Sequence, residues 1–120
     1  MKKLTLALAG SALFALASGA FAADLAAGKA AFEKFTCASC HGADGKSSVM
    51  PAYPILAGQH QDYLEHALRA YKRGASGAPA TANTRKNAIM GAMVAQLSPA
   101  DIQNISAWLA SLPSPLAVRK

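Results

Sequence analysis

Apolar residues recur at helical spacing in three stretches of the chain, which are separated by segments rich in polar residues, glycine and proline. The pattern predicts amphipathic helices over residues 24–35, 59–73 and 98–112. The apolar positions that define their buried faces are Leu25, Phe32 and Phe35 in the first, Tyr63, Leu64, Ala67, Leu68 and Tyr71 in the second, and Ile102, Ile105, Trp108 and Leu109 in the third.

Helix-end signals support these boundaries. Asp24 is placed to cap the first helix, and Gly74 is the expected stop of the second. Ser98 can cap the third helix, Pro99 fits its first position, and Asp101 lies near its positive end. The last helix is expected to end before the proline at position 113.

The connecting segments read as loops. Residues 46–58 contain two prolines, and residues 75–86 are rich in alanine, glycine, serine, threonine and proline. Residues 87–97 form an apolar run. No stretch alternates as a half-buried strand would, so the fold class is all-α. A chain of 120 residues has room for one domain.

The first 22 residues have the organisation of a secretory signal peptide. Lys2 and Lys3 precede an apolar run at 4–16, and Ala-Phe-Ala at 20–22 is a site for signal peptidase. We therefore predict a signal peptide at 1–22, cleaved after Ala22, and one domain at 23–120. The alternative, a retained membrane anchor, would be short for a bilayer span.

The chain is basic, with a formal net charge of +6, or +6 − 2 = +4 after removal of the two leader lysines. This charge suits an acidic docking partner or an anionic membrane surface, although charge for solubility alone explains it equally well. It lacks the dense Lys/Arg patch of a nucleic-acid binder. We expect no nucleic-acid partner.

The two cysteines form a motif with the next residue. Cys37-Ala38-Ser39-Cys40-His41 is C-x-x-C-H, the signature of c-type haem attachment. At this spacing both thiols can add to vinyl groups of one porphyrin, and His41 then lies under the iron as a ligand. The motif predicts one covalently bound haem c per chain.

Other uses of the cysteine pair fit less well. A thioredoxin-like C-x-x-C accompanies a βαβ pattern, and no strand is predicted here. A structural zinc site needs four ligands, and His60 and His66 could complete a set only from one predicted helix. A disulfide across so short a loop remains possible, but it would constrain the unfolded chain little.

From these residues the chain resembles the class I c-type cytochromes, and within them the small bacterial periplasmic monohaem type, which also forms one unit of the dihaem periplasmic cytochromes. The resemblance spans about residues 24–112. Its matching stretches are residues 37–45, residues 54–59 with the following Tyr63-Leu64, and Met90 through Leu97-Ser98 to Asp101 and Trp108. It implies about three to five helices around the haem, with the N- and C-terminal helices crossing.

The resemblance also implies roles for single residues. Gly28 and Phe32 match a pair on the N-terminal helix that crosses the C-terminal helix at Trp108. Pro54 matches the loop proline whose carbonyl accepts a hydrogen bond from the Nδ1–H of the haem-binding histidine, here His41. One departure is visible, because Cys37 stands one residue further from Phe32 than is common, which affects the exit of the first helix.

A class I cytochrome binds its iron through histidine and methionine, which raises the reduction potential. The predicted mature chain contains Met50, Met90 and Met93. Methionine is most often core filler, and Met50 lies in the loop that should cover the histidine side. Alignment of Leu97-Ser98 with the family pattern makes Met90 the sixth ligand and places Met93 at a packing position.

The resemblance implies a periplasmic electron-transfer protein, not an enzyme, that carries one electron between redox proteins, which could be membrane-bound. Such a protein has no small-molecule substrate and would be a monomer or loosely associated. Two other functions stay open: a five-coordinate haem enzyme or gas sensor, and a cytochrome subunit of a larger dehydrogenase or sulfur-oxidising complex. Lys72, Arg73, Arg85 and Lys86 could form a basic rim for docking or be merely solvated.

Overall fold

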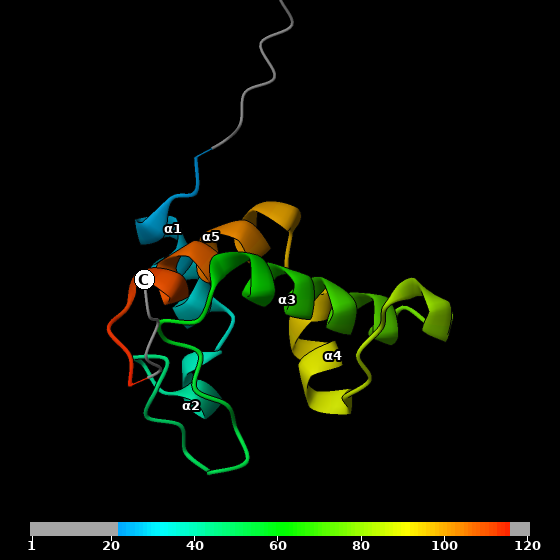
Figure 1. Ribbon diagram of the computed structural model, residues 1–120, viewed down its shortest axis with the longest axis horizontal. Coiled ribbons are helices and arrows are strands. Elements are labelled where there is room, and N and C mark those ends of the chain that lie inside the picture. The colour runs from blue at the N-terminus through cyan, green and yellow to red at the C-terminus, as the bar shows by residue number, and fades with distance from the viewer. Residues whose placement is uncertain (1–21, 116–120) are drawn as a thin grey trace, which may run out of the picture.

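The structure is a computed structural model, and it describes residues 22–115. Within this range the chain is all-helical, as predicted. The elements are α1 (Leu25–Lys34), α2 (Ala38–His41), α3 (Gln61–Ala75), the 3₁₀ turn η1 (Ala80–Ala82), α4 (Ala88–Ala95) and α5 (Pro99–Ser111) (Figure 1). Residues 1–21 of the predicted signal peptide lie outside the described range. Within that range, no helix has the length and apolarity needed to cross a bilayer.

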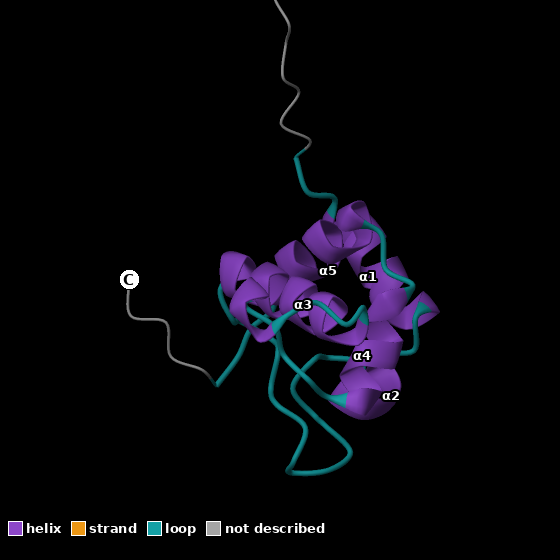
Figure 2. Cartoon of the chain, turned by 90° about the vertical axis from the view of Figure 1, so that its right-hand side faces the viewer, coloured by secondary structure: helices purple, strands orange, loops and turns teal. Residues whose placement is uncertain are grey.

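The first and last helices cross at a glycine, as predicted. Gly28 is buried, and a Cβ atom there would lie 2.1 Å from the Asn104 carbonyl oxygen and 2.8 Å from Trp108 Cβ. One turn later the rings of Phe32 and Trp108 pack with their centroids 5.0 Å apart. Figures 1 and 2 both show α1 against α5. Only glycine allows the two backbones to approach this closely.

The core follows the predicted apolar stripes with two exceptions, Leu25 and Tyr63. Ile102, Ile105 and Leu109 are buried in α5. Both predicted caps are present: the Asp24 side chain accepts a hydrogen bond from the Ala27 N–H, and α5 begins with the reciprocal capping box of Ser98 and Asp101. The prediction for Leu25 was wrong, because its side chain is 47% exposed. It occupies the first position of α1, one turn before the crossing at Gly28.

The exit of α1 accommodates the extra residue before the cysteine motif. Thr36 has φ of +57°, in the left-handed region, which is costly for a β-branched residue. The Thr36 N–H donates to the Glu33 carbonyl, and the Cys37 N–H donates to the Phe32 carbonyl, each at 3.0 Å. This is the Schellman pattern of a helix C-terminus, with threonine where glycine is usual. It turns the chain sharply from α1 into α2.

The prediction that Gly74 ends α3 was wrong. The helix continues through Gly74 to Ala75. A Cβ atom on Gly74 would lie 2.0 Å from the Arg85 carbonyl oxygen, while the Arg85 N–H donates to the Ala70 carbonyl at 3.0 Å. The glycine therefore permits the returning loop to lie against α3, instead of ending the helix.

Candidate functional site

The predicted haem-attachment residues lie on α2 and at its start. Cys37 is the N-cap, and its carbonyl accepts the His41 N–H at 3.0 Å, so the motif forms one helical turn. The chain leaves that turn at Gly42, whose φ is +80°. Cys37 and Cys40 are both free thiols and both partly buried. Burial raises the pKa of the Cys37 thiol.

His41 is held by the loop that the sequence pointed to. The His41 ring is buried, with 6% exposure, and its Nδ1 lies 3.1 Å from the Pro54 carbonyl oxygen. A carbonyl only accepts, so Nδ1 carries the proton and Nε2 keeps the lone pair that binds a metal. The Tyr53 ring, 6.1 Å away between centroids, further confines the imidazole. The hydrogen bond fixes both the tautomer and the ring orientation.

Backbone hydrogen bonds hold the Pro54 loop in place. The Gly45 carbonyl accepts from the N–H groups of Leu56 and Ala57, at 2.8 and 3.0 Å. The Gly58 N–H donates to the Leu109 carbonyl at 2.8 Å, which joins the loop to the end of α5. These bonds connect the histidine to the α1–α5 core through an otherwise irregular segment (Figure 2).

Asp44 organises the turn that follows the motif. Its carboxylate accepts hydrogen bonds from the N–H groups of Lys46 and Ser47 and from the Ser47 hydroxyl, at 2.7–2.9 Å. These bonds lower the Asp44 pKa to about 2, the Ser47 hydroxyl having the largest effect. Asp44 is therefore ionised at neutral pH and fixes the start of the 46–58 loop.

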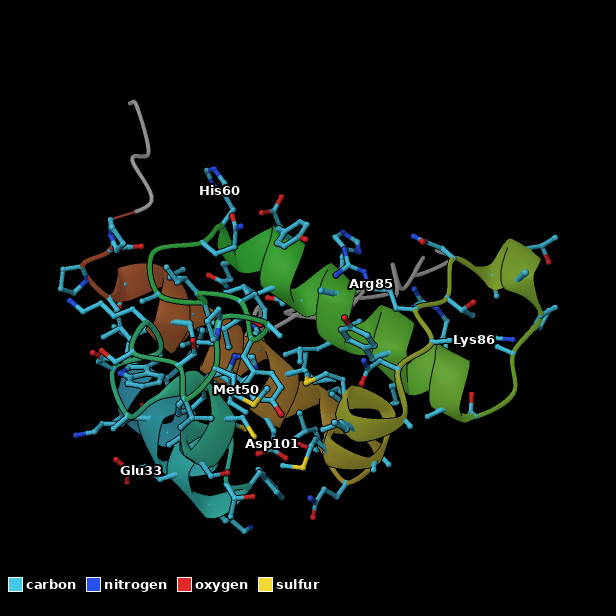
Figure 3. All side chains as sticks on the ribbon, turned by 90° about the horizontal axis from the view of Figure 1, so that it is seen from below. Glu33, Met50, His60, Arg85, Lys86 and Asp101 are labelled. Atoms are coloured by element: carbon cyan, nitrogen blue, oxygen red, sulfur yellow. The ribbon has the colours of Figure 1, made fainter. Side chains whose placement is uncertain are left out.

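The three methionines of the predicted domain differ in their surroundings. Met50 is 51% exposed in the 46–58 loop (Figure 3). Met90 is partly buried and packs against the same core cluster as Cys37 and Leu56. Its N–H donates to the Asn87 side chain at 2.9 Å, so Met90 lies in the capped first turn of α4. Met93 is also partly buried, one turn further along.

The zinc alternative finds no support in the described residues. Both histidines are exposed: His60 immediately precedes α3, and His66 lies on the surface of that helix. Within residues 22–115, no three His, Cys, Asp or Glu side chains come close enough to hold a metal ion together.

One arrangement was missed by the sequence analysis, which treated Arg85 only as part of a basic rim. The Arg85 guanidinium lies over the rings of Tyr63 and Tyr71, 5.4 and 5.7 Å from their centroids, and donates to the Tyr63 hydroxyl at 3.2 Å. Tyr63 is thus a half-exposed partner of an arginine, not a core residue. Tyr63 and Tyr71 are two helical turns apart, and this spacing was the signal in the sequence that both rings could contact one side chain.

The residues present fit a covalent c-type haem. Cys37 and Cys40 supply two free thiols at the motif spacing, and His41 presents a nitrogen whose tautomer is already set for a metal. A structural disulfide is not formed between the two cysteines. The donor set of two thiols and one oriented imidazole is the set that haem c requires.

Comparison with known sequences agrees with this chemistry. A family model described as cytochrome c matches residues 25–113. The chain is 41% identical over 116 residues to cytochrome c6 of Picosynechococcus sp., covering 92% of this chain and 93% of that protein. It is 40% identical over 79 residues to cytochrome c-554(548) of Halomonas halodenitrificans, covering 63% of this chain and 83% of that protein.

A solved structure shares the fold. The chain superposes on reduced recombinant cytochrome c4 from Pseudomonas stutzeri with a TM-score of 0.66 and 38% sequence identity. The match covers 77% of this chain and 47% of that one.

Proposed function

This chain belongs to the cytochrome c family, and from that premise we propose that it carries single electrons between redox proteins of the periplasm on an iron bound by His41 and Met90. It is an electron-carrier cytochrome with haem c covalently bound at the Cys37–His41 motif, and its relatives are small cytochromes, not enzymes. The periplasmic location, the methionine ligand and the partners belong to the proposal.

When bound, haem c supplies the Fe(III)/Fe(II) couple. Cys37 and Cys40 anchor the cofactor through two thioethers, so it stays attached in both oxidation states. The observation that carries the proposal is the 3.1 Å contact between His41 Nδ1 and the Pro54 carbonyl. That hydrogen bond holds the imidazole in one tautomer and one orientation, which favours its bond to a metal.

Two features support Met90 as the sixth ligand. It is partly buried against the core cluster that also contacts Cys37, whereas Met50 is half-exposed. The side chain of Asn87 caps the first turn of α4 at the Met90 N–H, which fixes the backbone that carries the thioether. If His41 and a methionine both bind the iron, no position is left on it for a substrate, as an electron carrier requires.

Absorption spectroscopy tests the ligand set. The oxidised protein should show the weak near-infrared band of Fe(III)–S(Met), and Met90→Ala should abolish the band and lower the reduction potential. Met93→Ala is the matched control and should keep both. A band that survives Met90→Ala and disappears in Met93→Ala would transfer the assignment to Met93.

Carbon monoxide separates a carrier from a five-coordinate enzyme or sensor. The reduced wild-type protein should not bind carbon monoxide rapidly at neutral pH, because methionine occupies the position. Fast stoichiometric binding would overturn the six-coordinate proposal. Gel filtration of the protein from its native source then distinguishes a free carrier from a subunit of a larger complex by size.

The proposed location has its own test. Mass spectrometry of the periplasmic fraction should find a chain that begins at Ala23 and carries one haem. A full-length chain in the membrane fraction would show instead that the leader is retained as an anchor.

A further inference from the structure

Almost no apolar side chain anchors the segment that leads to Met90. None of the residues 75–89 is buried, and the first buried residues of α4 are Gly91 and Val94, which follow Met90. We call residues 83–90 the methionine arm. Because the arm has no buried side chain of its own, its position before Met90 depends on contacts that it makes with the neighbouring helix α3.

The backbone of the methionine arm is attached to α3 at two points. The Arg73 guanidinium donates to the Asn83 carbonyl from Nε and Nη2, at 3.3 and 2.7 Å. The Arg85 N–H donates to the Ala70 carbonyl at 3.0 Å, and the Arg85 carbonyl lies against Gly74. Asn83 and Arg85 are both exposed, so water competes for these hydrogen bonds and limits what each contributes.

The Arg85 side chain adds a contact of a different kind. Its guanidinium lies over the rings of Tyr63 and Tyr71 on α3, 5.4 and 5.7 Å from their centroids, and donates to the Tyr63 hydroxyl at 3.2 Å (Figure 3). Among the described residues no acid pairs with Arg85, whereas Arg69 on α3 pairs with Glu65 at 3.0 Å. We call the guanidinium and its two rings the Arg85 clasp.

The clasp reaches from the surface to the core cluster that includes Met90. Tyr63 is 48% exposed, whereas Tyr71 is partly buried and packs against the same cluster as Met90. Only four residues separate Arg85 from Met90, and one of them, Asn87, accepts the Met90 N–H with its side chain at 2.9 Å. A short, capped segment therefore connects the clasp to the thioether.

We propose that Arg85 is a positioning residue, which closes the methionine arm onto α3 by stacking on Tyr63 and Tyr71 and so opposes release of the Met90 thioether from the iron. Each contact is weak at an exposed site, but the arm can move away only if the contacts break together. Arginine suits this role because its planar guanidinium stacks on a ring and donates hydrogen bonds at the same time. This inference rests on the proposed function, in which Met90 is the sixth ligand.

Imidazole, an external ligand that competes with methionine for ferric iron, tests the clasp. In the oxidised holoprotein, Arg85→Ala should raise the apparent affinity for imidazole about tenfold, because the open arm becomes more populated. Loss of the near-infrared band measures the binding. Arg85→Lys keeps the charge without the planar group, and its affinity should stay at least about threefold above that of the wild type.

Two control variants separate the clasp from charge and from general stability. Lys86→Ala removes one positive charge at the next residue, where no contact with either tyrosine is present. Ser98→Ala weakens the cap of α5, which lies outside the arm. Imidazole affinity should stay within about twofold of the wild type in both variants, because neither breaks a contact between the arm and α3.

A double-mutant cycle tests whether Arg85 acts through Tyr63. Tyr63→Leu removes one ring and should raise the imidazole affinity, whereas Tyr63→Phe keeps the ring, loses only the hydroxyl and should have the smaller effect. The effects of Arg85→Ala and Tyr63→Leu should not multiply in the double variant, because both remove the same contact. Fully multiplicative effects would contradict the clasp.

Amide hydrogen exchange follows the arm independently of the iron ligand. The N–H groups of Met90 and Gly91, which both donate to Asn87, should exchange about tenfold faster in reduced Arg85→Ala holoprotein and at the wild-type rate in Lys86→Ala. Unchanged exchange in Arg85→Ala overturns the clasp, whichever residue binds the iron.

Three results in the imidazole experiment would also overturn the proposal. They are an unchanged affinity in Arg85→Ala, an equal increase in Lys86→Ala, and a wild-type affinity in Arg85→Lys, which would leave charge as the only requirement. Failure of the proposed function is recognised separately, because a near-infrared band that survives Met90→Ala removes Met90 as the ligand without changing the amide exchange of the arm in Arg85→Ala.

Discussion

The α1–α5 crossing and the haem-binding segment are positioned by different forces. At the crossing, buried side chains fill the interface, with Phe32 1% and Leu109 2% exposed, and two backbones touch at Gly28. In the haem-binding segment, single hydrogen bonds position the residues, above all the bond from the His41 side chain to the Pro54 carbonyl and the backbone bonds to the Gly45 carbonyl. The crossing therefore tolerates no added atoms, whereas the haem segment depends on a few polar contacts. Substitutions should affect the two regions in different ways.

The largest expected effect is the loss of covalent haem when both cysteines are removed. Cys37→Ala with Cys40→Ala leaves no thiol to form a thioether, so the pyridine haemochrome signal of covalent haem c should vanish completely. Ser39→Ala is the control inside the same motif, because its hydroxyl bonds only to the Thr36 carbonyl in this segment. That variant should keep its haem. Covalent haem in the double variant would contradict the attachment chemistry.

Gly28→Ala should cost the most stability of the single substitutions considered. A methyl group there would lie 2.1 Å from the Asn104 carbonyl oxygen, so α1 and α5 must separate. We expect a loss of about 3 kcal/mol in the free energy of unfolding, measured by denaturant titration of the holoprotein.

The control for that experiment is Gly77→Ala, in the loop after α3. A Cβ atom there meets nothing within 4 Å, although its φ of +78° still disfavours alanine. The loss should be about 1 kcal/mol. Equal losses in the two variants would show that steric contact at the crossing is not what Gly28 avoids.

The cap of α5 should contribute less. Ser98→Ala removes the acceptor of the Asp101 N–H and should lower the free energy of unfolding by about 1 kcal/mol at pH 7. The Asp101 pKa is lowered mainly by the Ser98 hydroxyl. Its stabilisation is therefore present above the ordinary aspartate pKa of about 4 and fades as the pH falls through the lower folded value.

The pH dependence provides the matching control for the cap. Asp101→Asn should flatten the part of the stability-against-pH curve below about pH 4, since no carboxyl group remains to titrate there. Unfolding measured from pH 7 down to pH 3 in both proteins checks this. An unchanged slope in the asparagine variant would remove Asp101 from the explanation.

The smallest effect is expected at the exit of α1 and has the opposite sign. Thr36 occupies the left-handed region with φ of +57°. Thr36→Gly should therefore raise the free energy of unfolding by about 0.5–1 kcal/mol, measured by the same denaturant titration. Thr36→Ala keeps a side chain at that φ and should give no such gain, which separates relief of backbone strain from loss of the threonine side chain.

Much of this molecule was predictable because its signals are local. The caps at Asp24 and Ser98 each involve residues three apart, and the attachment motif spans a single helical turn. The hydrogen bond between His41 and Pro54 and the crossing at Gly28 came instead from resemblance to a family, since neither the distance along the chain nor the residue types alone would indicate them. Leu25 was misassigned because helical spacing does not reveal how far along a helix the contact with a crossing helix extends.

The sequence by itself determined the chemistry of the haem site, because Cys37, Cys40 and His41 are close neighbours in the chain. Their spacing within one helical turn is enough to fix how the three side chains lie relative to one another. Only the tertiary structure decided what Gly74 is for and why Arg85 lies between two tyrosines, since both depend on a loop returning to α3 after ten residues. It also decided which cations remain unpaired, because ion pairing depends on which surfaces meet. Interactions between residues close in the chain can be predicted from their order, whereas contacts between distant segments form only when the chain has folded.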